Sequence, residues 1–274
     1  MQPRVFGWLC AGLLGADGAL AQTYVVGVEQ QSFQPHFWQD ERGEYRGFAR
    51  ELLDLFAREA GVELRYQALP VSQLTRHLGN GSVDFKYPDS PDWGQGLKQG
   101  AAIAYSEPVV AYVDGVLVPP AQLGQGVEGL RRLALVEGWT PRDYQARMAA
   151  GQVEPIHAAD LRQMMRLALR READGAYYNV VVATYYLDNL RARPGALVFD
   201  PSLPHSRGAF HLSSLRHPQL IQRFDRFLRS HAEDIAVLKA RHGVEANLDS
   251  EYLGMEQWKV DFLKRRKDRQ EQTQ

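Results

Sequence analysis

Residues 86–93 bring polar and aromatic side chains together at the end of a predicted strand, which covers residues 83–87. Two prolines stiffen this segment, and its other members offer two aromatic faces, a carboxylate and a hydroxyl: Tyr87, Asp89, Ser90 and Trp93. The ends of strands line the binding cleft in open α/β proteins. We therefore expect the segment to contact a ligand, with Asp89 binding a cationic group. A turn with solvated aspartates is the alternative.

A second group of candidate residues follows a strand predicted at residues 133–136. Trp139 is a large aromatic beside a predicted helix start, with Thr140 at the N-cap and Pro141 at the first helical position. Free backbone N–H groups at a helix start favour an anion, although Thr140 would cap the helix with or without a ligand. Tyr178 and Asn179 leave another predicted strand at the facing edge.

The sequence contains no motif that indicates a catalytic or metal centre. The formal G-x-G-x-x-G match at residues 124–129 follows two prolines and precedes a strand, which is the wrong order for a dinucleotide site. The eight histidines lack metal-ligand spacing, and no G-x-S-x-G turn occurs. We expect no cofactor and no metal. A catalytic triad formed by residues far apart in the sequence stays an open alternative.

The N-terminus has the pattern of a secretory signal peptide. Arg4 precedes a short apolar run, and Ala-Leu-Ala at residues 19–21 provides a cleavage site. The run is too short to span a bilayer. We predict that residues 1–21 are removed, so that a periplasmic protein begins at Gln22. The single cysteine, Cys10, lies in the removed segment, so the mature chain has no thiol.

The order of predicted elements indicates an α/β protein with two lobes. Residues 24–87 alternate strand and helix in the order βαβαβ, which favours a mainly parallel sheet covered by helices. An α/β pattern begins again near residue 130, and a third section follows residue 206. We expect lobe 1 to comprise residues 22–114 and 205–258, and lobe 2 to comprise residues 115–204. Residues 259–274 form a charged tail.

Several segments resemble family 3 extracellular solute-binding proteins, the amino-acid type of receptor for ABC transporters. They are the opening at residues 26–53, the stretch LTRHLGNGSVD at residues 74–84, YSEP at residues 105–108 and ADGA at residues 173–176. The resemblance implies a type II periplasmic-binding-protein-like fold, with two α/β lobes joined by two hinge strands. It also implies that Phe33 stacks on the ligand. Trp38, in the same loop, is a further candidate.

Two charge anchors of the family are altered in this sequence. The resemblance implies an arginine shortly after the G-x-V-D stretch, but none occurs between Arg76 and Arg131, and Lys86 and Lys98 are the available cations. It also implies an aspartate where Asn179 stands. We therefore predict a ligand that is not held as an ordinary α-amino acid.

The sequence predicts a monomeric periplasmic solute-binding protein that captures a small polar ligand for an ABC permease and is not an enzyme. Nearly balanced charge, with 32 basic and 33 acidic residues, argues against a nucleic-acid partner. Two alternatives stay open. One is a sensory receptor for a signalling membrane protein, and the other is a dehydratase-like enzyme on the same fold.

Overall fold

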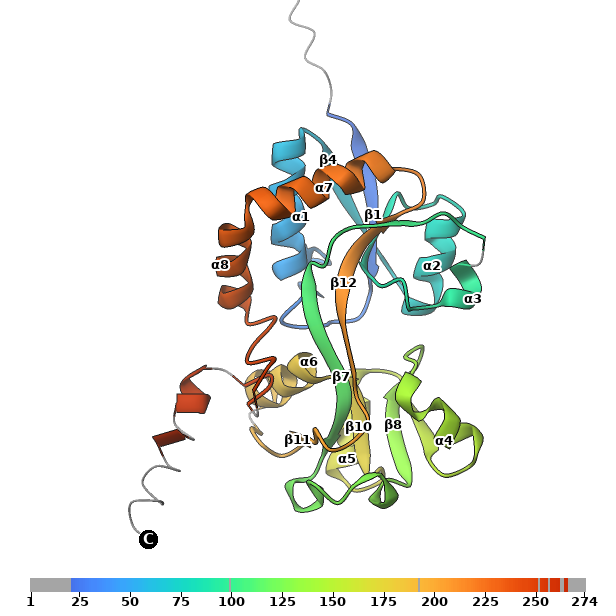
Figure 1. Cartoon of the computed structure of the whole chain (residues 1–274), viewed down its shortest axis with the longest axis vertical. Coiled ribbons are helices and arrows are strands. Elements are labelled where there is room, and N and C mark those ends of the chain that lie inside the picture. Colours follow the sequence, from blue (N-terminus) through green and yellow to red (C-terminus); the bar gives the residue numbers. More distant parts are fainter. Residues whose placement is uncertain are drawn as a thin grey trace, which may run out of the picture.

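The computed structural model describes residues 21–98, 100–191, 193–250, 252–255, 257–261 and 264–265. Two α/β lobes lie one above the other and are joined by two long strands (Figure 1). The predicted signal segment falls almost entirely outside the described residues, as does most of the predicted tail. None of the helices in the described part of the chain has both the length and the apolar character needed to cross a bilayer.

Lobe 1 is built on a parallel sheet with β1 (Thr23–Glu29) between β4 (Glu63–Leu69) and β5 (Phe85–Asp89). Two helices connect these strands, α1 (Phe48–Ala60) and α2 (Val71–Gly79). Each helix buries one apolar face, because its large apolar residues recur at intervals of three and four. The strands are therefore fixed so that their carboxyl ends lie on the same side of lobe 1.

Lobe 2 repeats this arrangement with β10 (Gly175–Asn179), β8 (Arg132–Val136) and β9 (Glu154–Ala158), which pair in parallel. Helix α5 (Leu161–Leu169) contacts all three strands, and α6 (Val180–Tyr185) follows β10 directly. Asp160 caps α5 by accepting a hydrogen bond from the backbone N–H of Gln163.

Two antiparallel strands, β7 (Val110–Val118) and β12 (Ser206–Ser214), run through both lobes and form the hinge (Figure 1). β12 pairs with β5 in lobe 1, whereas β7 pairs with β10 in lobe 2. Gly208 lies opposite Tyr112, and a Cβ at this position would lie 2.6 Å from the tyrosine hydroxyl. The Tyr112 ring therefore lies against Gly208, and a larger residue there would displace it.

The C-terminal part of the chain returns to lobe 1 and then crosses to lobe 2. Helices α7 (Pro218–Ser230) and α8 (Ala232–His242) pack on lobe 1, and the chain then runs down toward α6 (Figure 1). We call residues 243–255 the C-terminal strap. Its Leu253 is buried with Val180 and Val181 of α6. The strap is thus a third connection between the lobes, beside β7 and β12.

The remaining elements are short. They are β2 (Trp38–Gln39), β3 (Tyr45–Arg46), α3 (Gln95–Lys98), β6 (Ala104–Tyr105), η1 (Pro120–Gln122), η2 (Val127–Gly129), η3 (Arg142–Tyr144), α4 (Gln145–Ala149), the π-helical η4 (Tyr186–Leu190) and β11 (Val198–Phe199).

The helix predicted after Trp139 is present, as η3 followed directly by α4, but the prediction that Thr140 is its N-cap is wrong. One turn of 3-10 helix, η3, begins at Arg142, and Pro141 occupies its N-cap position without a side-chain cap. Pro141 has ψ of 83°, which is not helical, so Thr140 precedes an irregular turn and caps nothing.

Candidate functional site

A cavity of about 260 Å³ lies between the lobes on the side of α2 and α3, and we call it the interlobe cavity. It receives residues from the end of β1, from α2, from the loop after β5, from β7 and β10, and from the turn after β8. Its polar and aromatic lining consists of Glu29, Ser72, Thr75, Lys86, Asp92, Trp93, Asp114, Trp139, Thr140, Arg142, Tyr177 and Ser206. Its size limits it to a small molecule.

Two buried carboxyl groups face this cavity, and neither forms an ion pair with a cationic side chain among the described residues. No hydrogen bond or ion pair joins the Glu29 carboxylate to any of the described residues, and Asp114 accepts only a long bond of 3.4 Å from Asn179. Burial raises the pKa of Glu29 to about 7. Burial raises the pKa of Asp114 to about 7, although the hydrogen bond from Asn179 and the positive charge of Arg142 lower it, each more strongly than the negative charge of Glu29 raises it. A cation placed between them would offset the free-energy cost of burying the two ionised carboxylates.

The cationic residues of the cavity differ in how far they are already neutralised. Lys86 is buried and donates to Thr75 Oγ1 at 3.1 Å and to Asp89 Oδ1 at 2.9 Å. Arg142, from lobe 2, is more exposed and lies 3.5 Å from Asp92 of lobe 1. Arg142 is therefore the cation better placed to meet an anionic group, and its pair with Asp92 links the lobes across the cavity mouth.

Two tryptophans from opposite lobes line the cavity. Trp93 packs against Tyr112 and Phe210 of the hinge strands, with ring centroids 5.8 and 5.7 Å apart. Trp139 stacks on Tyr178 with centroids 4.2 Å apart. These contacts hold both indoles in place, so they present flat apolar faces to a ligand.

Asp89 is fully buried and lies behind the cavity wall. Its carboxylate accepts hydrogen bonds from Lys86, Lys98 and Ser213 at 2.7 to 2.9 Å, and from the backbone N–H of Ser90. Lys98 also donates to the Ser90 carbonyl. Four donors therefore surround the group predicted to recruit a ligand cation, and both candidate lysines are occupied in neutralising it.

Phe33 lies in an aromatic cluster where the lobes touch. It is 2% exposed, and its ring centroid is 5.9 Å from that of Trp139 and 5.7 Å from that of Tyr178, both in lobe 2. It also stacks on Phe37 at 5.2 Å. Phe33 thus fills the space between the lobes itself in this arrangement. Tyr87, in β5, is also buried, and its hydroxyl has no hydrogen-bond partner in the part of the chain that the structure describes.

Asn179 joins the hinge to lobe 2. It is fully buried, its side-chain oxygen caps α6 at the backbone N–H of Val182, and its amide donates to Asp114. Asn179 and Asp114 are also direct partners in the pairing of β10 with β7. A carboxylate therefore lies immediately beside the amide, supplied by the hinge strand.

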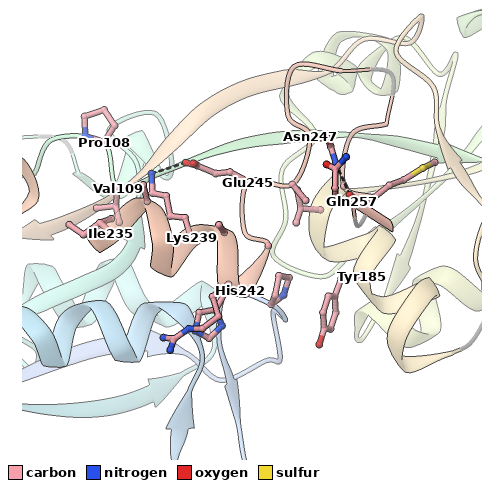
Figure 2. A pocket seen from close by; sticks show the side chains of 18 of the residues that line it. Pro108, Val109, Tyr185, Ile235, Lys239, His242, Glu245, Asn247 and Gln257 are labelled. Carbon is pink, nitrogen blue, oxygen red and sulfur yellow. Dashed lines mark hydrogen bonds and ion pairs between the residues drawn. The ribbon is translucent and has the colours of Figure 1, made fainter. Parts of the chain in front are cut away.

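Trp38 lines a different hollow, of about 1000 Å³, between α8 and the end of α6. Figure 2 shows this hollow, with the strap residues Glu245 and Asn247 between Lys239 of α8 and Tyr185. Glu245 accepts from Lys239 Nζ at 2.9 Å and from the backbone N–H of Ala111 at 2.7 Å. The side of the hinge with α8 is thus bridged by the strap, whereas the interlobe cavity lies on the side with α2 and α3.

The interlobe cavity thus brings together three of the predicted site residues, Trp93, Trp139 and Thr140. The other eight lie outside its lining. They are Phe33, Trp38, Tyr87, Asp89, Ser90, Lys98, Tyr178 and Asn179.

Comparison with protein families is consistent with this architecture. The family described as bacterial extracellular solute-binding proteins, family 3, matches residues 24–234. The chain belongs to this family. It has the type II periplasmic-binding-protein fold, as the sequence predicts. The match ends before the strap begins.

Solved structures of a transporter's binding protein and of a sensor domain are similar in fold at low sequence identity. An ABC uptake transporter substrate-binding protein from Streptococcus pneumoniae with bound histidine is 16% identical, with a TM-score of 0.66, covering 80% of this chain and 92% of that chain. A histidine kinase sensor domain is 19% identical, with a TM-score of 0.65 and coverages of 81% and 96%.

A third similar structure is an ancestral amino acid-binding protein that is a precursor of cyclohexadienyl dehydratase. It is 17% identical to this chain, with a TM-score of 0.63, covering 80% of this chain and 94% of that chain. No curated protein is significantly similar in sequence.

Sequence reasoning missed the two acidic residues of this solute-binding protein's cavity, although each leaves a signal. Glu29 is the last residue of β1 and directly follows its apolar run, so its charged side chain lies at the carboxyl end of the strand. Asp114 is the single charged residue in β7, and a lone charge in an apolar strand indicates a buried ionisable group. Arg142 gives no comparable signal, because its turn is stabilised by tertiary contacts.

Proposed function

We propose that this chain is a periplasmic solute-binding protein that closes on a small ligand bearing a cationic group. The cation lies between Glu29 and Asp114, and an apolar part of the ligand lies against Trp93 and Trp139. One observation carries the proposal: two buried carboxyl groups line the cavity between the lobes, and neither makes an ion pair or a hydrogen bond with a cationic side chain among the described residues.

The chemistry of the cavity favours an organic amine over a sugar or a simple anion. A buried carboxylate is costly unless it is paired, and an ammonium group placed between two of them is attracted by both. Aromatic faces add to the attraction for a cation. Arg142 is available for an anionic group elsewhere on the ligand. The prediction that the ligand is not held as an ordinary α-amino acid remains part of the proposal.

A thermal-shift screen at pH 8 tests the proposal. The panel contains primary amines, the standard α-amino acids, carboxylates and sugars. A ligand at about 100 times its Kd should stabilise the protein by roughly 2.7 kcal/mol. Amines should give such a shift, and the shift should disappear in Glu29→Gln and Asp114→Asn. Glu128→Gln, at an exposed position away from the cavity, is the control and should respond as the wild type does.

Three outcomes of the screen have separate meanings. Stabilisation by sugars or carboxylates that persists in Glu29→Gln and Asp114→Asn would refute the role of the acidic pair. Micromolar binding of a standard α-amino acid, lost in the same variants, would refute only the prediction about α-amino acids. Chemical conversion of a bound ligand, detected by mass spectrometry, would favour the enzyme alternative.

A sensory role is the second candidate, because a histidine kinase sensor domain has the same fold. Loss of ligand uptake on deletion of the gene supports transport through an ABC permease. Unchanged uptake together with loss of a transcriptional response to the ligand supports sensing.

A further inference from the structure

Five arginines surround a hollow of about 190 Å³ on lobe 2. Three come from α5 and its C-terminal end, and two follow η4. We call this site the arginine hollow, and its arginines are Arg162, Arg166, Arg170, Arg191 and Arg193. Its lining also includes Met165, Leu169 and Tyr186, and it shares no residue with the interlobe cavity.

The spacing of these arginines opposes helix stability. Arg162, Arg166 and Arg170 are four residues apart, so adjacent guanidinium groups lie on one face of α5 and repel each other. The two additional arginines, which come from a different segment, bring more positive charge to the same hollow. A local rule that is broken without visible compensation is typical of a functional site.

Carboxylates neutralise only part of this charge. Arg162 lies 3.5 Å from Asp160, and Arg170 lies 3.9 Å from Glu172, and all four side chains are largely exposed. For the other three arginines, which are Arg166, Arg191 and Arg193, the described residues provide no ion pair and no side-chain hydrogen bond. The hollow therefore has an excess of about three positive charges, because arginine stays protonated.

Tyr186 lies in the lining of the hollow together with the five arginines. Tyr186 is 8% exposed. Burial raises the pKa of Tyr186, and the positive charges of Arg191, Arg162 and Arg166 act in the opposite direction. Three arginines from two segments thus line the same hollow as Tyr186, and one small anion in it could contact them together.

We propose that the arginine hollow binds a phosphate group, either of a small phosphorylated anion or of an anionic phospholipid headgroup. The planar fork of arginine matches phosphate oxygens with two parallel hydrogen bonds, and three unpaired forks suit a tetrahedral anion. The hollow is small enough to enclose such a group. This site is separate from the interlobe cavity and does not depend on the function proposed for it.

Calorimetric titration with tripolyphosphate tests the site in the full mature protein. We compare the wild type with the double variant Arg166→Gln/Arg191→Gln. The control is Arg58→Gln/Arg226→Gln, which removes the same charge from exposed positions on lobe 1. Each lost charged hydrogen bond should weaken binding roughly tenfold or more. The first variant removes two guanidinium groups and should therefore lose about a hundredfold or more in affinity, and the control should keep the wild-type value.

A parallel flotation experiment distinguishes the two sources of phosphate. Binding to phosphatidylglycerol vesicles but not to phosphatidylcholine vesicles, lost only in Arg166→Gln/Arg191→Gln, identifies a lipid headgroup. Tripolyphosphate binding without vesicle binding identifies a small anion. Equal weakening in both double variants would show a diffuse charge effect and overturn the proposal. Binding of neither probe, or tighter binding of a poly-glutamate peptide than of tripolyphosphate, would also overturn it.

Discussion

The acidic pair in the interlobe cavity predicts an unusual pH dependence of stability. Glu29 and Asp114 both have pKa values raised to about 7, against ordinary values near 4. Between about pH 4 and pH 7, such a carboxyl group is protonated in the folded state but ionised in the unfolded state. Its contribution to stability is fully present below pH 4 and is lost as the pH rises through about 7.

The size of the effect follows from the shifts. For Glu29, a change from 4.5 to about 7 corresponds to about 3 kcal/mol at pH 8. Glu29→Gln should therefore be more stable than the wild type at pH 8 without ligand, by up to about 3 kcal/mol, or about 6 to 12 °C in Tm. At pH 5 the gain should shrink to below about 1 kcal/mol. Asp114→Asn should behave similarly, but the two gains should not add, since the groups repel each other.

The measurement is thermal unfolding of wild type, Glu29→Gln, Asp114→Asn and the control Glu128→Gln between pH 5 and pH 8.5. The Glu128 side chain is 81% exposed, so its substitution should leave the curve unchanged. A Tm difference for Glu29→Gln that is independent of pH would refute the assignment of a raised pKa. Destabilisation at pH 8 would show that the carboxylate has a cationic partner in solution.

Three further predictions concern packing and charge. Asp89→Asn should lower the free energy of unfolding in urea by about 3 kcal/mol or more, because it leaves two buried lysines unpaired; a loss below 1 kcal/mol would contradict this. Gly175→Ala should cost about 1 to 3 kcal/mol, because the new Cβ would lie 2.5 Å from Val116. Gly129→Ala, with its nearest neighbour at 3.8 Å, is the comparison and should cost less. Leu253→Asp should release the strap from α6 and increase the radius of gyration in X-ray scattering without ligand, and an unchanged radius would show that the strap does not restrain the lobes.

Local periodicity is why most of the fold could be predicted. The helix predicted at residues 161–169 is α5, because its buried residues recur at helical spacing. β9 was missed, since it is an edge strand with mostly exposed side chains and a proline, and so it has no apolar alternation. α8 was also missed, because it buries few residues and its apolar face is weak.

The candidate site was less predictable, because its chemistry depends on which charges meet in space. Asp89 and Lys98 both look available in the sequence, but the structure pairs them with each other. Asp114 is 65 residues from Asn179 and becomes its neighbour only through the pairing of β7 with β10. Which charges are neutralised internally and which are left for a ligand follows from strand pairing that no local pattern encodes.

The same arrangement explains how a ligand would favour the closed form of the lobes under the proposed function. The contacts that join the lobes across the cleft are individually weak. The exposed pair Arg142–Asp92 is worth about 0 to 1 kcal/mol, and the contact of Phe33 with Trp139 about 0.5 to 1.5 kcal/mol beyond the area it buries.

Against these contacts acts the repulsion between Glu29, at the end of a lobe 1 strand, and Asp114, on the hinge strand beside lobe 2, which the positive charges of Lys86 and Arg142 partly offset. A cation between the two carboxylates converts this repulsion into attraction only when the lobes are together. Its affinity for the closed form therefore exceeds its affinity for the open form, and this difference is what a ligand needs to shift the equilibrium. Glu29→Gln, by removing the repulsion, should close the lobes without ligand while weakening the binding of a cation.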